Sequence, residues 1–321
     1  MLKKITIALA IFSWLLFFGQ AGRALTILSP VVEMEAEPGQ TQKGILKVFN
    51  ETQEDLTLVS SVEPFAAGGE SGQPVYLLPE EKDKFLQWFK LENESILIKP
   101  GQFAVISFSV EVPIEAPPGG YYAAIFWQKE SRPGPQKNSG LGVSGKAGAL
   151  ILLKVKGDLK ETGEIVEFSA NSEKNYFFGL PVDFVVRFAN SGNIHLAPAG
   201  EIELKSWLGK TEKLEFNPAK RNILPASIRR FEVVWGQTGG KEFFSGALAE
   251  LKHLSFGRYT ATLNLSFGAE AGQKIHRRLN FWIIPARLIA VLSALIFISA
   301  GLFKINAKVN RLKKKGHGKK K

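Results

Sequence analysis

The chain has 321 residues, a formal net charge of +11 and no cysteine, so disulfides and metal sites built on thiolates are excluded. The excess of basic residues lies at the two ends: 3 of the 41 Lys and Arg residues fall in residues 1–24, 1 is Arg287 and 9 fall in residues 304–321. The remaining 28 basic residues and all 30 acidic residues lie in residues 25–286. The middle of the chain is therefore near neutral, and its charge gives no reason to expect nucleic acid binding.

Residues 1–24 have the form of a secretory signal peptide. Two lysines precede an apolar run at 5–18, and small residues follow it up to Ala24. This order predicts export with cleavage after Ala24. An uncleaved membrane anchor is the alternative, because Arg23 is an unusual residue beside a cleavage site.

Apolar and polar side chains then alternate with a period of two over most of the chain. The alternation is clear in 104–112, 182–188 and 259–267, and it is typical of half-buried antiparallel strands. Turn-forming Gly, Pro and Asn residues separate these runs at short intervals. The pattern predicts an all-β fold of two tandem immunoglobulin-like β-sandwiches, followed by a single C-terminal transmembrane helix.

An internal repeat supports two modules of similar length. KGILKVFN at 43–50 resembles VDFVVRFAN at 182–190, and each run ends in an asparagine. We therefore expect domain 1 at residues 25–157 and domain 2 at residues 158–284, joined at a Gly-Asp pair. Two modules of this size are large enough to bury cores without disulfides.

A Gly-x-Tyr element opens a late strand in each module. Aligning Tyr122 with Tyr259 predicts that both hydroxyls tie back to a nearby backbone group, as tyrosines do in immunoglobulin-like sandwiches. If Tyr122 faces inward, alternation along the strand directs Tyr121 and Trp127 outward. Exposed aromatic side chains of this kind stack on sugar rings or anchor protein partners.

Two segments fall outside the repeat. Residues 129–148 form a long glycine-rich stretch that predicts a surface loop, and its G-x-G-x-x-G match at 140–145 lacks the strand and helix that a phosphate site needs. Residues 243–254 predict a short helix that packs against the core.

The candidate residues for partner binding are aromatic side chains and lysines, with core packing as the alternative for each aromatic one. They are Trp88, Tyr121, Trp127, Lys137 and Lys146. The four histidines are scattered, and no nucleophile elbow is present. We therefore predict no catalytic residue, no metal, no cofactor and no enzymatic activity.

The C-terminal region predicts the membrane span. Residues 288–303 carry no charge, but 16 residues cover only about 24 Å of a hydrocarbon core of about 30 Å, so the helix must include flanking residues. We place the span at 285–303 and a basic tail at 304–321. By the positive-inside rule, the tail is cytoplasmic and binds anionic lipid, and the domains are extracellular, giving a single-pass type I protein of the cell membrane. A buried helix of a soluble protein is the alternative.

Several turn and strand signatures resemble those of the bacterial WxL-interacting cell-surface proteins. They are residues 27–30 (ILSP), 37–40 (EPGQ), 48–50 (VFN), 98–101 (IKPG) and 118–121 (PGGY). The resemblance implies a signal peptide, two immunoglobulin-like domains, one span and a basic tail. It also implies a first domain associated with peptidoglycan and a second associated with host or surface proteins.

Together these features predict a membrane-anchored binding or structural protein of the bacterial cell envelope. Its β-sandwiches are expected to bind cell-wall polymer or another surface protein. The alternative function is an assembly or chaperone-type module that offers a sheet edge to another exported chain.

Overall fold

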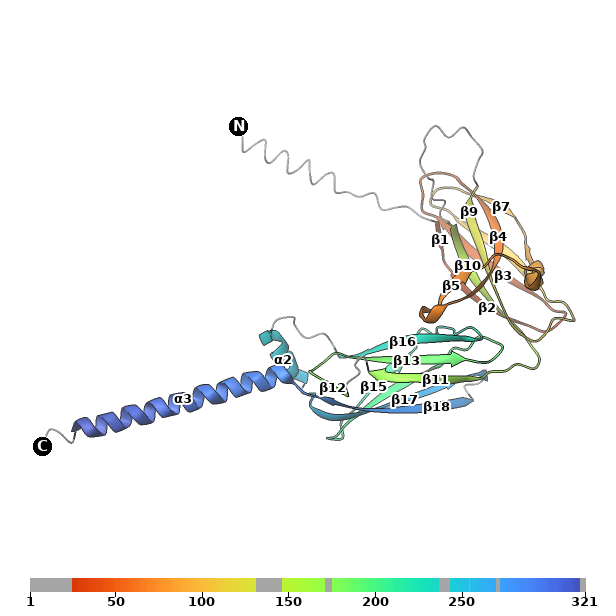
Figure 1. Ribbon diagram of the computed structural model, residues 1–321. Coiled ribbons are helices and arrows are strands. Elements are labelled where there is room, and N and C mark those ends of the chain that lie inside the picture. The colour runs from red at the N-terminus through yellow and green to blue at the C-terminus, as the bar shows by residue number, and fades with distance from the viewer. Residues whose placement is uncertain are drawn as a thin grey trace, which may run out of the picture. The chain divides into compact units, whose positions relative to one another are not determined.

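The computed structural model describes residues 25–130, 146–170, 175–236, 243–253, 255–269 and 272–317. The predicted signal peptide and Lys137 lie outside these residues. The chain divides into two compact units (Figure 1): unit 1 comprises Met1–Ala67 and Pro74–Lys160, and unit 2 comprises Gly68–Gln73 and Glu161–Lys321. Strands make up most of the described chain, as the alternation predicts, and a long helix, α3 (Ala286–His317), lies at its C-terminal end.

Unit 1 contains two sheets. Its elements are β1 (Leu25–Ile27), β2 (Val31–Ala36), β3 (Thr41–Asn50), β4 (Leu56–Gly68), β5 (Gln73–Tyr76), η2 (Glu81–Trp88), β6 (Phe89–Leu91), β7 (Ser95–Ile98), β8 (Phe103–Glu111), β9 (Gly119–Lys129) and β10 (Lys146–Val155). Sheet 1a has the order β1-β3-β8-β6, and sheet 1b has the order β2-β10-β9-β4-β5, with β7 also pairing with β4. The chain thus crosses from one sheet to the other between β1 and β2, and β2 pairs with β10 in parallel.

The core of unit 1 follows from the period-two pattern. In β8, Ile106, Phe108 and Val110 are buried while the residues between them are exposed or half-buried. They pack with buried residues of sheet 1b such as Ile125 and Ile151. Burying one face of each sheet against the other stabilises the unit by roughly 1.5–3 kcal/mol for each large apolar side chain.

Unit 2 also contains two sheets. Its elements are η1 (Gly69–Ser71), β11 (Gly163–Ala170), β12 (Tyr176–Phe177), β13 (Val182–Asn190), β14 (Ala199–Ser206), β15 (Thr211–Phe216), β16 (Ser227–Trp235), α2 (Phe243–His253), β17 (Gly257–Phe267), β18 (Gln273–Ile283) and α3 (Ala286–His317). Sheet 2a has the order β11-β13-β16, and sheet 2b has the order β12-β18-β17-β14-β15. Phe184 and Phe188 of β13 lie in the core with Leu263 of β17 and Phe281 of β18.

The helix α3 supplies the length that the predicted span lacked. Its apolar part, Ala286–Lys308, has 23 residues and contains an 18-residue stretch with a mean hydropathy of 2.4. At about 1.5 Å per residue the 23 residues cover about 35 Å. By length and composition this helix is able to cross a membrane. The helix also extends past the predicted boundary at residue 303 to His317, because residues 304–315 contain neither proline nor glycine.

The helix at 243–254 is present as α2, but its predicted role in the core is wrong. Ala247 is buried, whereas Leu248 and Leu251 are 67% and 51% exposed. The apolar face that suggested core packing is therefore directed to solvent in the described structure.

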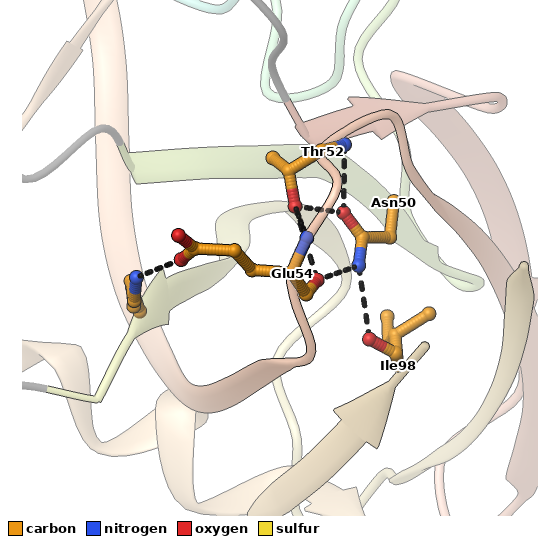
Figure 2. A network of polar contacts seen from close by, with 5 residues as sticks. Asn50, Thr52, Glu54 and Ile98 are labelled. Carbon is orange, nitrogen blue, oxygen red and sulfur yellow. Dashed lines mark hydrogen bonds and ion pairs between the residues drawn. The ribbon is translucent and has the colours of Figure 1, made fainter. Parts of the chain in front are cut away.

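Buried Asn50 ends β3 and joins three parts of unit 1 (Figure 2). Its side-chain nitrogen donates to the carbonyl oxygens of Glu54 at 2.8 Å and Ile98 at 2.9 Å. Its side-chain oxygen accepts from the backbone N–H of Thr52 at 2.9 Å and from the Thr52 hydroxyl at 2.6 Å. One amide therefore fixes the end of β3, the turn that follows it and the end of β7.

Buried Asn190 does the same at the end of β13 in unit 2. Its side-chain nitrogen donates to the carbonyl oxygens of Ile194 and Ile223, both at 2.8 Å, and its oxygen accepts from the N–H of Gly192 at 2.9 Å. The two asparagines that end the repeated sequence runs thus form equivalent networks.

The tyrosine alignment was wrong by one residue. Tyr121 donates its hydroxyl to a nearby carbonyl, that of Pro117, at 2.8 Å, and it packs against the core of unit 1. Gly119 and Gly257 both have positive φ at the start of β9 and β17, and counting from them pairs Tyr121 with Tyr259. A shift of one residue exchanges the two faces of a strand, so every face assigned along β9 was reversed.

Candidate functional site

The predicted outward pair on β9 does not face solvent. Trp127 is fully buried in the core of unit 1, which corrects its assignment as a partner-binding residue. The prediction assumed that only one face of β9 is covered, but Phe126 on the opposite face is also buried, against the ring of Tyr76 at 4.7 Å.

Trp88 and Tyr121 do come together, but as packing groups. Their ring centroids lie 4.7 Å apart, and Phe85 lies 5.4 Å from Tyr121. Both predicted residues are half-buried, and burial raises the pKa of the Tyr121 hydroxyl, which is committed to Pro117. This cluster fastens η2 to the sandwich. The sequence pattern missed Phe85 because η2 has no clear period.

Lys146 is the candidate residue that the structure places at an accessible site. It begins β10, forms an ion pair with Glu63 and lies over the ring of Phe126, with its nitrogen 4.0 Å from the centroid. Burial and the Glu63 carboxylate raise the pKa of Tyr76, which packs on the same ring. Lys146 is therefore held over an aromatic surface of sheet 1b.

The backbone of β10 beside Lys146 is open on one side. β9 pairs with the whole of β10, but β2 pairs only from Leu150 onward, where the Leu150 N–H donates to Pro30 O at 2.8 Å. Alternate residues direct their peptide groups to opposite sides of a strand, so those of Lys146 and Gly148 point to the β2 side. No described strand pairs with them there.

Small residues follow Lys146 along this edge. Ala147 and Gly148 are half-buried and Ala149 is buried, and a Cβ atom on Gly148 would lie 2.3 Å from the Phe126 ring, so that position favours glycine. The segment that leads into β2 carries Leu28 and Val31, which are 50% and 48% exposed. We call Lys146–Ala149 the β10 edge.

A second feature of unit 1 is a hollow on the outer face of sheet 1a. It has a volume of about 530 Å³, and its lining includes the exposed lysines Lys43 and Lys90 together with Ile45, Leu91 and Ser107. Within the described ranges, no group of three or more His, Asp or Glu residues is arranged to hold a metal ion.

No family model and no curated protein matches the sequence. Among solved structures, the chain is similar to the class 5 fimbriae chaperone CfaA, with 13% identity, a TM-score of 0.39 and coverage of 82% of this chain and 100% of that one. It is similar to the E. coli chaperone DraB at 11% identity and a TM-score of 0.33, covering 81% and 97%. It is also similar to a PapD-like domain of human CEP192 at 16% identity and a TM-score of 0.29, covering 41% and 84%. These values are low, and no functional residue is transferred from these proteins. The resemblance to WxL-interacting proteins stays a prediction.

Proposed function

We propose that the chain is a membrane-anchored, non-enzymatic protein of the bacterial cell envelope that binds an extended segment of another exported protein. The observation that carries the proposal is the β10 edge, where the peptide groups of Lys146 and Gly148 point to the β2 side and no described strand pairs with them. A peptide added to a free edge gains main-chain hydrogen bonds along its length. This is the chaperone-type or assembly function that the sequence offered as its alternative.

Charge supports this edge over the open parts of β3 and β18. Natural sheets protect exposed edges with lysines, inward-directed charges, prolines or covering loops. The open part of β3 carries exposed Lys43 and Lys47, and that of β18 carries a row of basic side chains. The β10 edge has only Lys146, whose charge is engaged by Glu63.

Single cysteines test the proposal cleanly because the chain has none of its own. Lys146→Cys places a thiol-reactive cross-linker at the β10 edge. Lys154→Cys is the matched control, because Lys154 lies on the same strand and also forms an ion pair, but β2 covers the edge at that point. We expect position 146 alone to cross-link a discrete envelope protein through an extended, apolar segment. Equal cross-linking at both positions, or none, would count against the β10 edge.

The hollow on sheet 1a favours a second function, the binding of an anionic cell-wall polymer. Its lining contains two lysines, Lys43 and Lys90, and one acidic residue, Glu92, and Ile45 and Leu91 provide apolar contact. Paired Lys43→Ala and Lys90→Ala changes are expected to reduce co-sedimentation with purified cell wall, whereas Lys213→Ala in unit 2 is not. Unchanged sedimentation would remove this function.

The membrane arrangement is part of the same proposal: α3 spans the bilayer, the two units are outside and the basic tail is inside. In intact cells, a membrane-impermeant maleimide is expected to label Ser29→Cys and not Lys313→Cys. The reverse labelling would invert the orientation.

A further inference from the structure

The end of unit 2 from which α3 emerges is fixed to that helix with almost no linker. β18 ends at Ile283 and α3 begins at Ala286. The N–H of Ile284 donates to Phe177 O of β12 at 2.8 Å, so the chain stays paired almost to the start of the helix. This end of the unit must therefore lie close to the bilayer surface when α3 spans it.

The first turn of α3 is also tied to α2. The Glu250 carboxylate of α2 accepts from the N–H of Leu288 at 2.8 Å and so satisfies one of the free donors at the helix N-terminus. Gly246 of α2 lies so close to Arg287 that a Cβ atom there would be 1.8 Å from a guanidinium nitrogen. The short helix is thus held against the start of the apolar helix (Figure 1).

Exposed aromatic and apolar side chains gather at this same end. They are Tyr176, Phe178, Trp207, Leu208, Phe256 and Trp282, with exposed fractions from 39% to 71%. We call this set the collar.

Backbone and ring contacts link the members of the collar. The Trp207 indole donates to Phe256 O at 3.0 Å, and the Trp207 N–H donates to Arg258 O at 2.9 Å. Arg258 is the cross-strand partner of Trp282, which is in turn the partner of Tyr176 on β12. The collar is therefore one continuous surface across β14, β17, β18 and β12.

An apolar surface of this kind needs an occupant, because soluble domains rarely expose large contiguous apolar patches. Tryptophan and tyrosine are enriched at the headgroup level of membranes, where the ring is apolar on one side and its polar atom meets water. Exposed Leu248 and Leu251 give α2 the apolar face of a helix that lies in the membrane interface. Arg258, exposed beside Trp282, suits anionic headgroups.

We propose that the collar and the exposed face of α2 insert into the lipid headgroup layer, so that unit 2 is seated on the membrane by its own folded surface. This inference rests on the proposed spanning of the bilayer by α3. It adds a lipid-binding surface outside the span and the basic tail, and it fixes which end of unit 2 meets the bilayer.

Tryptophan quenching in vesicles tests the collar in the full chain. α3 contains no tryptophan, and Trp127 and Trp235 are buried, so in a Trp14→Phe background the exposed or half-buried indoles are those of Trp88, Trp207 and Trp282. The chain is reconstituted into phosphatidylcholine and phosphatidylglycerol vesicles, with or without bromine in the upper part of the acyl chains. We expect brominated lipid to quench the fluorescence, and the double variant Trp207→Phe Trp282→Phe to lose that quenching. Trp88→Phe is the matched control and is expected to keep it.

The outcomes separate the collar from the anchor. If the chain resists extraction by alkaline carbonate but brominated lipid does not quench it, the collar is wrong and the anchor stands. The same holds if the double variant is quenched as strongly as its parent. If the collar instead covers a second copy of the chain, quenching is absent and cross-linking depends on the density of protein in the vesicle. Release of the chain by alkaline carbonate would contradict both the collar and the membrane anchor. The single variants Trp207→Phe and Trp282→Phe, each expected to lose part of the quenching, keep the test valid if the double variant fails to fold.

Discussion

The last strands of the two units, β10 and β18, have equivalent neighbouring strands but different residues along their unpaired edges. Each pairs antiparallel with the strand before it and parallel with a short early strand, β2 or β12. The early strand covers β10 from Leu150 onward, but it covers β18 only at Trp282 and Ile283. Both last strands are therefore open over part of their length within the described structure.

The difference lies in the side chains on the open parts. β18 carries exposed Lys274, His276, Arg277 and Arg278, and Arg277 occupies an inward position of the alternation. Inward-directed and repeated charges are the means by which natural sheets prevent edge pairing. The β10 edge has small uncharged residues after Lys146. The same arrangement of strands thus carries charged residues along its open part in unit 2 and small uncharged residues in unit 1.

The largest expected effect tests whether unit 1 binds through its edge or through Trp127. Trp127→Ala empties a fully buried site and is expected to lower the free energy of unfolding by about 3–5 kcal/mol, measured by chemical denaturation of the full chain in detergent. Trp127→Phe is expected to cost much less, because the indole nitrogen has no hydrogen-bond partner within the described residues. A stable Trp127→Ala chain that has lost only partner binding would restore Trp127 as a contact residue.

The next effect tests whether the hydrogen-bond networks of Asn50 and Asn190 contribute equally to the stability of the two units. Asn50→Ala removes the amide that donates to Glu54 O and to buried Ile98 O, and Asn190→Ala removes the amide that donates to Ile194 O and Ile223 O. Each change is expected to cost about 2–3 kcal/mol of unfolding free energy, seen as a lower denaturation midpoint. Thr52→Val, which removes one hydroxyl from the same network, serves as the milder control. A large cost in only one unit would show that the networks are not equivalent.

Removing the charges of β18 sharpens the comparison of the edges. Lys274→Val with Arg277→Val is expected to make the unit 2 edge adhesive and to strengthen self-association at least tenfold, which is about 1.4 kcal/mol. Light scattering of the detergent-solubilised chain measures this change. Lys205→Val, on the central strand β14, should leave the mass unchanged. An unaltered mass for the first pair would mean that charge does not guard β18.

The smallest effect concerns ion pairs on each unit. Hydrogen bonding by Lys154 lowers the pKa of Glu35 in unit 1, and the Ser169 hydroxyl and then Arg187 lower that of Glu167 in unit 2. A carboxyl group whose pKa is lowered by folding stabilises the folded state at pH values above its ordinary pKa of about 4.5. That stabilisation is lost as the pH falls through the pKa of the folded state. Each pair is solvent-exposed and screened, so we expect less than about 1 kcal/mol. Glu35→Gln and Glu167→Gln should each flatten the fall in melting temperature below pH 4.5, and an unchanged slope would rule the pair out.

Much of the fold was predictable because it depends on local patterns. The alternation in 104–112 and 182–188 predicted β8 and β13, and the shared terminal asparagine marked equivalent corners. The helix at 243–254 was found to within one residue. Its surroundings were not, because periodicity shows that a helix has an apolar face but not what that face meets.

The candidate site was predicted only in part. Lys146 is the first residue of the β10 edge, whereas Trp127 was assigned to the wrong face because the repeat was aligned one residue out of register. No sequence signal marks the β10 edge itself, since it depends on where β2 stops pairing. The collar was missed for a similar reason: its aromatic residues are scattered through the sequence, and only the fold brings them together.

By itself, the sequence determined the β-class of the chain, its repeated corners and the presence of a helix apolar enough to span a bilayer. These follow from side-chain period, turn residues and length, which are properties of neighbouring residues. The tertiary structure decided which face of β9 is buried, which strand edge stays open and which aromatic residues surround the start of α3. Those depend on register and on pairing between distant segments, where a shift of one residue reverses the outcome.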